Sequence, residues 1–199
     1  MADQEITGKC GGYMITFCPA LGRGVFGTVH KAVHIKSKEQ LAAKQLILSG
    51  TKLQKEHTLR EAQEELNMIQ NVQGHQNIVQ LYDHMHMNNA YWIFMELCDL
   101  GDLHDFMDKS PRMEIERKVK IMLQSSSAIA YMHKQHPPIV HRDIKQKNIM
   151  LKRFRRDFQV KLTDFGFSKL MFGRRTLSAA FTQDAQLSSL RGSPYFMAP

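Results

Sequence analysis

The spacing of apolar residues changes at Cys98, and this change constrains the fold more than any other feature of the sequence. Upstream of Cys98 apolar and polar residues mostly alternate, which is typical of half-buried strands, and only residues 58–72 have helical spacing. Asn88 and Asn89 predict a turn. The alternation predicts strands at residues 13–36, around a glycine cluster, and at 41–48, 78–82 and 91–97. We therefore expect hairpins and one amphipathic helix in the first half.

Downstream of Cys98 the pattern becomes mainly helical. Residues 114–133 have the spacing of a long helix, and Pro137 and Pro138 end it because proline cannot continue the hydrogen-bond ladder. Residues 167–199 are rich in Ser, Thr, Gly and Arg without a sustained period, so we expect a long functional loop. Shorter patterns predict a connector at 99–102, a helix at 103–107, and strands at 149–151 and 160–162.

Composition limits the size of the fold and its compartment. With 199 residues the chain can bury the core of one large domain or two small lobes, which excludes a disordered or fibrous protein. Cys10, Cys18 and Cys98 have the pattern of neither a disulfide framework nor a zinc site. No run approaches the roughly 18 apolar residues of a membrane span, and Asp3 and Glu5 stand where a secretory signal would be basic. We therefore expect a soluble intracellular protein without membrane insertion, with the cytoplasm as its compartment.

A net charge of +8 raises the alternative of nucleic-acid binding, because lysine and arginine neutralise phosphates. The basic residues are spread along the chain, however, and the densest group spans only residues 152–156. No stripe of stacking aromatic residues accompanies that group, as single-strand binding would require. A solvated hairpin tip is the favoured interpretation, a basic docking patch is the alternative, and no nucleic-acid partner is expected.

A glycine-rich turn interrupts the first expected strands. Gly22, Gly24 and Gly27 form the pattern G-x-G-x-x-G, which lets backbone N–H groups approach phosphate oxygens, although the spacing also fits a simple turn. A Rossmann loop would open a helix and precede an acidic residue by about 20 positions, whereas here a strand follows and Lys44 stands at that distance. A Walker loop would end in Gly-Lys-Ser/Thr, and this turn does not.

Lys44 lies within an apolar strand, where a buried charge would need a partner. The side chain could point to solvent, or it could face nucleotide phosphates and be held by a carboxylate. At about 100° per residue, Glu65 falls beside the apolar face of the expected helix, between Ile69 and Val72, whereas Glu64 points nearly opposite. We therefore predict an ion pair between Lys44 and Glu65.

The most informative stretch is His-Arg-Asp-Ile-Lys-Gln-Lys-Asn at residues 141–148. A loop with Asp143, Lys145 and Asn148 can hold a base, a cation that neutralises phosphate, and a metal ligand. The tripeptide Asp-Phe-Gly follows the next pair of expected strands, and Asp164 offers a second hard oxygen ligand suited to Mg²⁺. The tripeptide alone occurs often by chance, but its position after the first motif is specific.

Together these residues resemble the eukaryotic protein kinase family, of the serine/threonine type. The matching motifs are, in order, the glycine-rich turn, Ala-Ala-Lys at 42–44, Glu65, the stretch 141–148, Asp-Phe-Gly at 164–166, and Arg-Gly-Ser-Pro-Tyr-Phe-Met-Ala-Pro at the end. The resemblance implies an α+β, bilobal protein-kinase fold. In it, a complete β-rich N-lobe with the hinge occupies residues 1–98, and a partial helical C-lobe with the catalytic loop and activation segment occupies residues 99–199.

The resemblance also implies a binding site for ATP and Mg²⁺. Lys44 would contact the α- and β-phosphates and pair with Glu65 in the active state, and Asn148 and Asp164 would bind Mg²⁺. Met95 would be the gatekeeper at the entrance to the hinge. The implied ATP-binding residues are Leu21, Gly22, Gly24, Gly27, Val29, Ala42, Lys44, Met95, Glu96, Cys98, Asp102 and Met150.

The implied reaction transfers the γ-phosphoryl group of ATP to a Ser or Thr hydroxyl of a protein substrate. Asp143 would orient the hydroxyl and accept its proton, and Lys145 would neutralise the γ-phosphate. Lys145 and Ser193 favour the serine/threonine type over the tyrosine type. His141 and Phe165 are expected to pack in the core rather than to do acid–base chemistry. The alternative is a non-catalytic ATP-binding or decoy protein, although the catalytic residues that such proteins typically lose are present.

Arg142, next to the expected catalytic aspartate, implies regulation by phosphorylation of the activation segment. Ser188 or Ser189 is the expected site, since each stands at the family's usual distance before the Ala-Pro sequence. A phosphate there could draw Arg142 and Lys169 together. Family members continue Ala-Pro with Glu and further helices, whereas Ala-Pro ends this sequence. We therefore expect residues 1–199 alone, whether a fragment or a natural short form, to bind nucleotide with weak or absent turnover.

Overall fold

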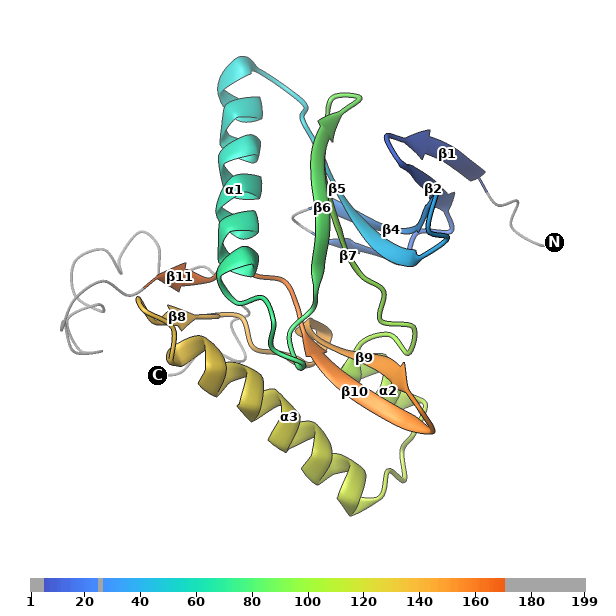
Figure 1. The fold of residues 1–199 in the computed structure, drawn as a ribbon, viewed down its shortest axis with the longest axis vertical. Helices are drawn as coiled ribbons and strands as arrows, with labels where there is room; N and C mark the ends of the chain where they lie inside the picture. Colours follow the sequence, from blue (N-terminus) through green and yellow to red (C-terminus); the bar gives the residue numbers. More distant parts are fainter. Residues whose placement is uncertain (1–5, 25–26, 171–199) are drawn as a thin grey trace. The chain divides into compact units, whose positions relative to one another are not determined.

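The computed structural model describes residues 6–24 and 27–170, which divide into two compact units (Figure 1). The first unit contains the chain up to Asn67 together with Val79–Cys98. The second contains Met68–Ile78 together with the chain from Asp99 onward. The first unit is built on an antiparallel sheet and the second on helices and short hairpins, so the α+β fold class is confirmed.

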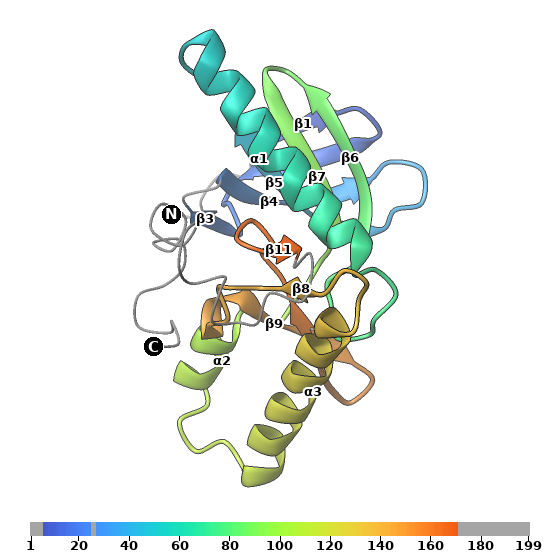
Figure 2. The same cartoon turned by 90° about the vertical axis from the view of Figure 1, so that its left-hand side faces the viewer.

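The sheet of the first unit has the strand order β1-β2-β4-β5-β7-β6, and β3 pairs with β4. All of these pairings are antiparallel. Helix α1 (Lys52–Asn71) connects β5 to β6 and lies across one face of the sheet (Figure 2). The strands are β1 (Ile6–Cys10), β2 (Tyr13–Cys18), β3 (Gly22–Gly24), β4 (Gly27–His34), β5 (Gln40–Ile47), β6 (Leu81–Met87) and β7 (Ala90–Glu96).

Two asparagines close the β6–β7 hairpin at the predicted turn. Asn88 and Asn89 have φ values of 52° and 55°. Two consecutive positive φ values are those of a type I′ turn, whose twist matches that of the flanking strands. The preceding strand begins at Leu81 and not at Ile78 as predicted, because Ile78 forms a parallel bridge with Leu162 in the second unit.

The edge strand β1 was not predicted. It pairs with β2 through a tight turn at Gly11 and Gly12, and Gly11 has a φ of 55°, which favours glycine. Of the five residues of β1 only Cys10 is buried. The strand therefore lacks the regular alternation of apolar side chains by which the other strands were recognised.

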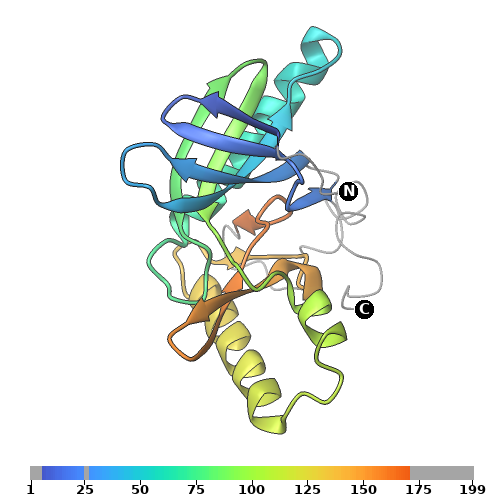
Figure 3. The same ribbon diagram turned by 90° about the vertical axis from the view of Figure 1, so that its right-hand side faces the viewer.

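The sheet curls (Figure 3). Side chains of its own strands form a buried cluster on one face. Tyr13 stacks on Phe94 with 3.8 Å between ring centroids, and its hydroxyl donates to Asp83 Oδ2 at 2.9 Å. Trp92 is buried in the same cluster. Strands β2 and β6 lie towards opposite ends of the strand order. The hydrogen bond between Tyr13 and Asp83 can therefore form only because the sheet is curled. Each aromatic pair of this kind contributes about 0.5–1.5 kcal/mol beyond its buried area.

Helix α1 begins at Lys52 rather than at residue 58, where its apolar spacing starts. Thr51 and Gln54 form a capping box: Thr51 Oγ1 accepts from the Gln54 N–H at 3.3 Å, and Gln54 Oε1 accepts from the Thr51 N–H at 2.8 Å. These bonds satisfy two backbone donors at the helix start, so the exposed first turns are helical. Further along, Ala62 and Leu66 are buried as predicted.

The second unit combines helices with two small sheets. Helix α2 (Leu103–Asp108) is followed by α3 (Ile115–His133), and β9 (Ile149–Phe154) and β10 (Asp157–Leu162) form a hairpin whose turn lies in the basic segment at residues 152–156. No helix in the described part of the chain has the length and apolar character of a membrane span. The remaining elements are β8 (Ile139–Val140), the 3-10 turn η1 (Gln146–Asn148) and β11 (Lys169–Leu170), which pairs with β8.

The segment 68–78 groups with the second unit, whereas we expected all of residues 1–98 to form the first. Asn77 gives the reason: it is 1% exposed, and its amide donates to Gln124 Oε1 and to the Val160 carbonyl, both at 3.0 Å. The Asn77 carbonyl accepts from the Leu162 N–H at 2.8 Å. These bonds join the segment to α3 and β10. The first unit ends at Cys98, and the second resumes at Asp99.

Candidate active site

The strand register of the first unit places five of the expected ATP-binding residues on one face of the sheet. Val29 pairs with Lys44 across β4 and β5, and Ala42 pairs with Met95 across β5 and β7. Gly22 pairs with Val29. Directly opposed residues of antiparallel strands project from the same face, and so do residues two apart on one strand. All five residues therefore share a face, and because Lys44 contacts a residue of α1, it is the face that α1 covers.

Lys44 and Glu65 form the predicted ion pair. The Lys44 Nζ lies 2.6 Å from Glu65 Oε1 and 2.7 Å from Oε2, so both carboxylate oxygens accept from one ammonium. The two side chains are only 9% and 8% exposed. Removal of either partner would leave a buried charge without its counterion, which is strongly destabilising. Glu64, on the opposite side of the helix, is exposed.

The three glycines of the turn have different reasons to lack a side chain. Gly27 has a φ of 128°, and a Cβ there would lie 2.2 Å from the Gln45 carbonyl oxygen, so only glycine fits. At Gly22 and Gly24 an added Cβ would meet no atom of the described residues within 4 Å. Their backbone is therefore accessible to a ligand, as phosphate binding requires. Leu21, which precedes them, is 51% exposed.

The end of β7 carries the other expected contacts of the first unit. Met95, the expected gatekeeper, is 9% exposed. The Glu96 N–H donates to the Gln80 carbonyl at 2.8 Å, so its carbonyl is the backbone group that could meet adenine. The Glu96 carboxylate accepts from the Gln80 N–H at 3.2 Å. Cys98 is buried and is the last residue of the first unit.

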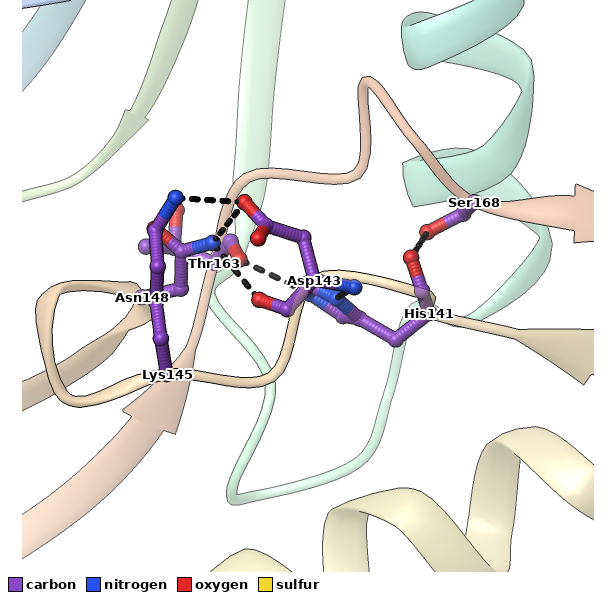
Figure 4. A network of polar contacts seen from close by, with 6 residues as sticks. All are labelled: His141, Asp143, Lys145, Asn148, Thr163 and Ser168. Carbon is purple, nitrogen blue, oxygen red and sulfur yellow. Dashed lines mark hydrogen bonds and ion pairs between the residues drawn. The ribbon is translucent and has the colours of Figure 1, made fainter. Parts of the chain in front are cut away.

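In the second unit, Asp143 is the centre of a hydrogen-bond network (Figure 4). Its Oδ2 accepts from Lys145 Nζ at 2.7 Å and from Asn148 Nδ2 at 2.8 Å. Asn148 Nδ2 also donates to the Asp143 backbone carbonyl at 2.8 Å. The Asp143 side chain is 1% exposed, so these charge-assisted bonds replace the water that the carboxylate has lost. The loop thus holds the carboxylate, the ammonium and the amide in contact.

His141 anchors the same loop in one tautomer. Its Nε2 lies 3.0 Å from the Thr163 carbonyl oxygen, which can only accept, and its Nδ1 lies 3.3 Å from the Asp143 N–H, which can only donate. The ring proton is therefore on Nε2. Burial lowers the pKa of the imidazole below its usual range and keeps the ring neutral. Its centroid lies 5.3 Å from that of Phe165, consistent with the expected packing role.

The two expected magnesium ligands belong to adjacent segments. The Thr163 N–H donates to the Asn148 carbonyl at 3.1 Å, so Asp164 directly follows a residue bonded to Asn148. Because the Asn148 amide nitrogen is bonded to Asp143, its side-chain oxygen is the atom suited to a cation. Asp164 has a φ of 64°, a conformation that costs a non-glycine residue about 1–3 kcal/mol and often occurs at functional sites. An amide oxygen and a carboxylate are a donor set that fits Mg²⁺.

Asp102 and Met150 are neighbours in the second unit, joined by an isolated antiparallel bridge. Asp102 has a further role that was not predicted: its Oδ1 accepts from the Asp105 N–H at 2.9 Å and caps α2. The signal was present, since Asp directly before a short helical pattern is a typical N-cap. The carboxylate of this expected ATP-binding residue therefore also stabilises local structure.

The regulatory residues are described only in part. Arg142 has a φ of 65°, and its Nε donates to the Phe167 carbonyl at 2.6 Å. Lys169 is exposed and lies in β11, which pairs with the strand β8 just before Arg142. The expected phosphorylation sites and the serine used to assign the kinase type lie outside the described residues; they are Ser188, Ser189 and Ser193.

Comparison with known proteins identifies the family. Residues 15–199 match the Protein kinase domain family. The matched region includes the paired Lys44 and Glu65 and the whole Asp143 loop. The chain therefore belongs to the protein kinase family.

Individual relatives are similar to most of this chain. Serine/threonine-protein kinase kin-29 of Caenorhabditis elegans is 32% identical over 180 residues. Calcium-dependent protein kinase 5 of Plasmodium falciparum is 33% identical over 180 residues, and mitogen-activated protein kinase kinase kinase 2 of Arabidopsis thaliana is 32% identical over 184. Each match covers 90% of this chain, but only 20%, 28% and 26% of the respective relative. The chain thus spans about a fifth to a quarter of the length of these relatives.

Proposed function

We propose that this chain is the catalytic region of a serine/threonine protein kinase, which transfers the γ-phosphoryl group of ATP to Ser or Thr hydroxyls of protein substrates. The observation that carries the proposal is the Asp143 loop, in which one buried carboxylate is held by an ammonium and an amide. Membership of the protein kinase family supports it, as does the similarity to a serine/threonine kinase. The buried pair of Lys44 and Glu65 is a second support.

Asp143 suits the role of the group that orients the acceptor hydroxyl and takes its proton. Two donors fix its Oδ2, so the carboxylate keeps one orientation as substrate arrives. Lys145, 24% exposed, brings a positive charge to within 2.7 Å of that oxygen. The same charge would neutralise the transferred phosphoryl group, because this reaction depends mainly on positioning and electrostatic stabilisation.

Groups of each unit suit different parts of the nucleotide. In the first unit, the open backbone at Gly22 and Gly24 would approach phosphate oxygens, and Lys44, held by Glu65, would contact the α- and β-phosphates. In the second, Asn148 and Asp164 would hold Mg²⁺, which when bound neutralises phosphate charge. Because Lys44 is held by both oxygens of Glu65, its ammonium is positioned before the nucleotide arrives.

The test measures ATP affinity and phosphoryl transfer in parallel on the 199-residue chain, with γ-labelled ATP, Mg²⁺ and a generic protein substrate. Asp143→Asn keeps the size of the side chain but removes the carboxylate. We expect transfer to fall at least about 100-fold, with ATP affinity changed by no more than about twofold. Asp108→Asn is the matched control, because this carboxylate at the end of α2 is 70% exposed and should leave both quantities unchanged.

The outcomes separate the alternatives. Label on phosphoserine and phosphothreonine that disappears in Asp143→Asn supports the proposal. Transfer that persists in Asp143→Asn contradicts the role of this residue. ATP binding without transfer by the parent chain, at high protein concentration, contradicts phosphoryl transfer by residues 1–199 alone and favours the non-catalytic ATP-binding alternative for this chain. Absence of ATP binding contradicts both functions.

A further inference from the structure

Three sulfur atoms meet inside the curled sheet of the first unit. The Cys10 Sγ lies 3.9 Å from Met85 Sδ and 3.8 Å from Met87 Sδ. Cys10 ends β1 and the methionines are on β6, so the cluster joins the two outermost strands of the sheet order. We call these three residues the sulfur cluster. None of them belongs to the proposed kinase site.

The local backbone makes room for the sulfur cluster. Residues 85 and 87 lie two apart on β6 and therefore share a face, while His84 and His86 project from the other. A Cβ at Gly11 would lie 2.9 Å from the Met85 Sδ, so glycine there avoids crowding this sulfur. Cys10 is 2% exposed, whereas both methionines are half-buried. The two thioethers are thus more exposed than the thiol that they contact.

Ordinary packing accounts for the cluster only in part. Thioethers and thiols are soft, polarizable groups that fill gaps in apolar cores. A thiol carries one proton, however, so Cys10 can donate to only one of its two sulfur neighbours at a time. With the proton removed, all three sulfurs are electron-pair donors, and the two thioether sulfurs lie 3.9 and 3.8 Å from the thiolate sulfur.

The two separations from the Cys10 Sγ are compatible with sulfur ligands around one metal ion. With a bond of about 2.3 Å between a d¹⁰ metal ion and sulfur, trigonal geometry places the sulfurs about 4.0 Å apart and tetrahedral geometry about 3.8 Å apart. The two measured separations from Cys10, 3.9 and 3.8 Å, agree with these values. Thiolate and thioether ligands together select Cu(I) among biological metal ions.

We propose that Cys10, Met85 and Met87 bind one Cu(I) ion. On binding, the Cys10 S–H bond breaks, its proton goes to water, and a Cu–S bond forms without any change of oxidation state. One thiolate and one monovalent cation give a neutral site, which the apolar interior of the sheet can hold at little electrostatic cost. A divalent ion such as Zn²⁺ would leave one uncompensated positive charge in the same place. A thiol must lose its proton to become a metal ligand, so copper binding at this site weakens as pH falls.

The test titrates the 199-residue chain anaerobically with Cu(I) held by the chromogenic chelator bicinchoninate. We expect the chain to remove one equivalent of Cu(I) at this site. The double variant Met85→Leu/Met87→Leu conserves volume and should raise the dissociation constant at least about tenfold, and Cys10→Ser should abolish binding at this site. Cys18→Ser is the matched control, because Cys18 lies outside the sulfur cluster and its loss should leave the affinity unchanged.

X-ray absorption of the copper-loaded parent chain tests the ligands without relying on variants. Three sulfur neighbours at about 2.3 Å support the proposal. A shell dominated by nitrogen would overturn it and assign the metal to His84 and His86 instead. Equal affinity of the parent and the double methionine variant would also overturn it. Thermal unfolding without copper establishes that each variant is folded before its affinity is interpreted.

Discussion

Gly24 and Gly27 belong to the same turn, but they lack a side chain for different structural reasons. Gly27 is required by the fold, since a side chain there would collide with the Gln45 carbonyl. Gly24 has room for a side chain among the described residues, so its lack of one matters only to a molecule that approaches from outside. The common spacing of the glycines in the sequence hides this difference.

We predict that alanine at position 27 lowers stability, whereas alanine at position 24 lowers the affinity for ATP. Gly27→Ala should lower the free energy of unfolding by at least about 2 kcal/mol, because it adds both a clash and an unfavourable φ. Gly24→Ala should change stability by less than about 0.5 kcal/mol but weaken ATP binding. Urea denaturation and calorimetric titration with ATP measure the two quantities. Equal loss of stability in both variants would contradict the distinction.

His141 should make stability depend on pH. Its pKa in the folded protein lies below the unfolded value of about 6.5, so between these two values the unfolded state binds more protons. The free energy of unfolding should therefore be unaffected by His141 above about pH 6.5 and fall as the pH decreases below it, by up to about 1.4 kcal/mol per pH unit. His141→Gln should reduce this slope in denaturation curves at pH 5 to 8. An unchanged slope would show that the buried ring is not the cause.

Among single residues, the sequence predicted those contacts that follow from the position of a residue within a single helix or strand. Glu65 was found from its phase on the helix, and Lys44 from its charge within an apolar strand. The Asp143 loop was recognised from its motif, but a motif does not specify which side chains bond to which within the loop. The capping role of Asp102 was missed, although its place directly before a helical pattern is typical of an N-cap.

Among the elements, α1 shows that caps as well as apolar spacing set helix boundaries. We predict that Thr51→Ala lowers the free energy of unfolding by about 1 kcal/mol, because it breaks the capping box with Gln54. Thr58→Ala is the matched control: Thr58 Oγ1 bonds the Gln54 carbonyl within the helix, a contact that contributes little. Chemical denaturation compares the two. A larger loss for Thr58→Ala would contradict the assigned role of the cap.

Elements with a strong local signal were predicted, and those that depend on distant partners were not. The asparagine turn, α3 and the β9–β10 hairpin fall where the pattern placed them. Strand β1 was missed because it is an exposed edge with one buried side chain. The strand expected from Ile78 begins later, because Ile78 forms an isolated bridge with Leu162 far along the chain.

On the scale of the whole molecule, the hydrogen bonds of Asn77 join residues 68–78 to the second unit. We predict that Asn77→Ala increases the rate of amide hydrogen exchange in α3 and β10, because the Gln124 side chain and the Val160 carbonyl each lose a donor. Exchange in β4 and β5 should be unchanged. Asn67→Ala is the control, since Asn67 is exposed and accepts from Gln63 within α1. Faster exchange throughout the chain would contradict a role confined to the second unit.

The α+β fold and the family could be inferred from the sequence, because ordered motifs constrain the whole chain at once. The unit boundary within α1 could not, because it depends on hydrogen bonds between residues 47 and 83 positions apart. No local pattern contains that information. The first unit, by contrast, is largely a set of consecutive hairpins, whose pairings follow from short turns.

The shared face of Val29, Ala42, Lys44 and Met95 has a consequence for how this protein can change in length. Side chains alternate between the two faces along β5. One residue inserted between Ala42 and Lys44 would place these two side chains on opposite faces, whereas an insertion of two residues would keep them on the same face. Insertions in the turns before and after β5 leave this alternation intact. Natural length variation and engineered insertions should therefore gather at the turns, and any insertion accepted within β5 should contain an even number of residues.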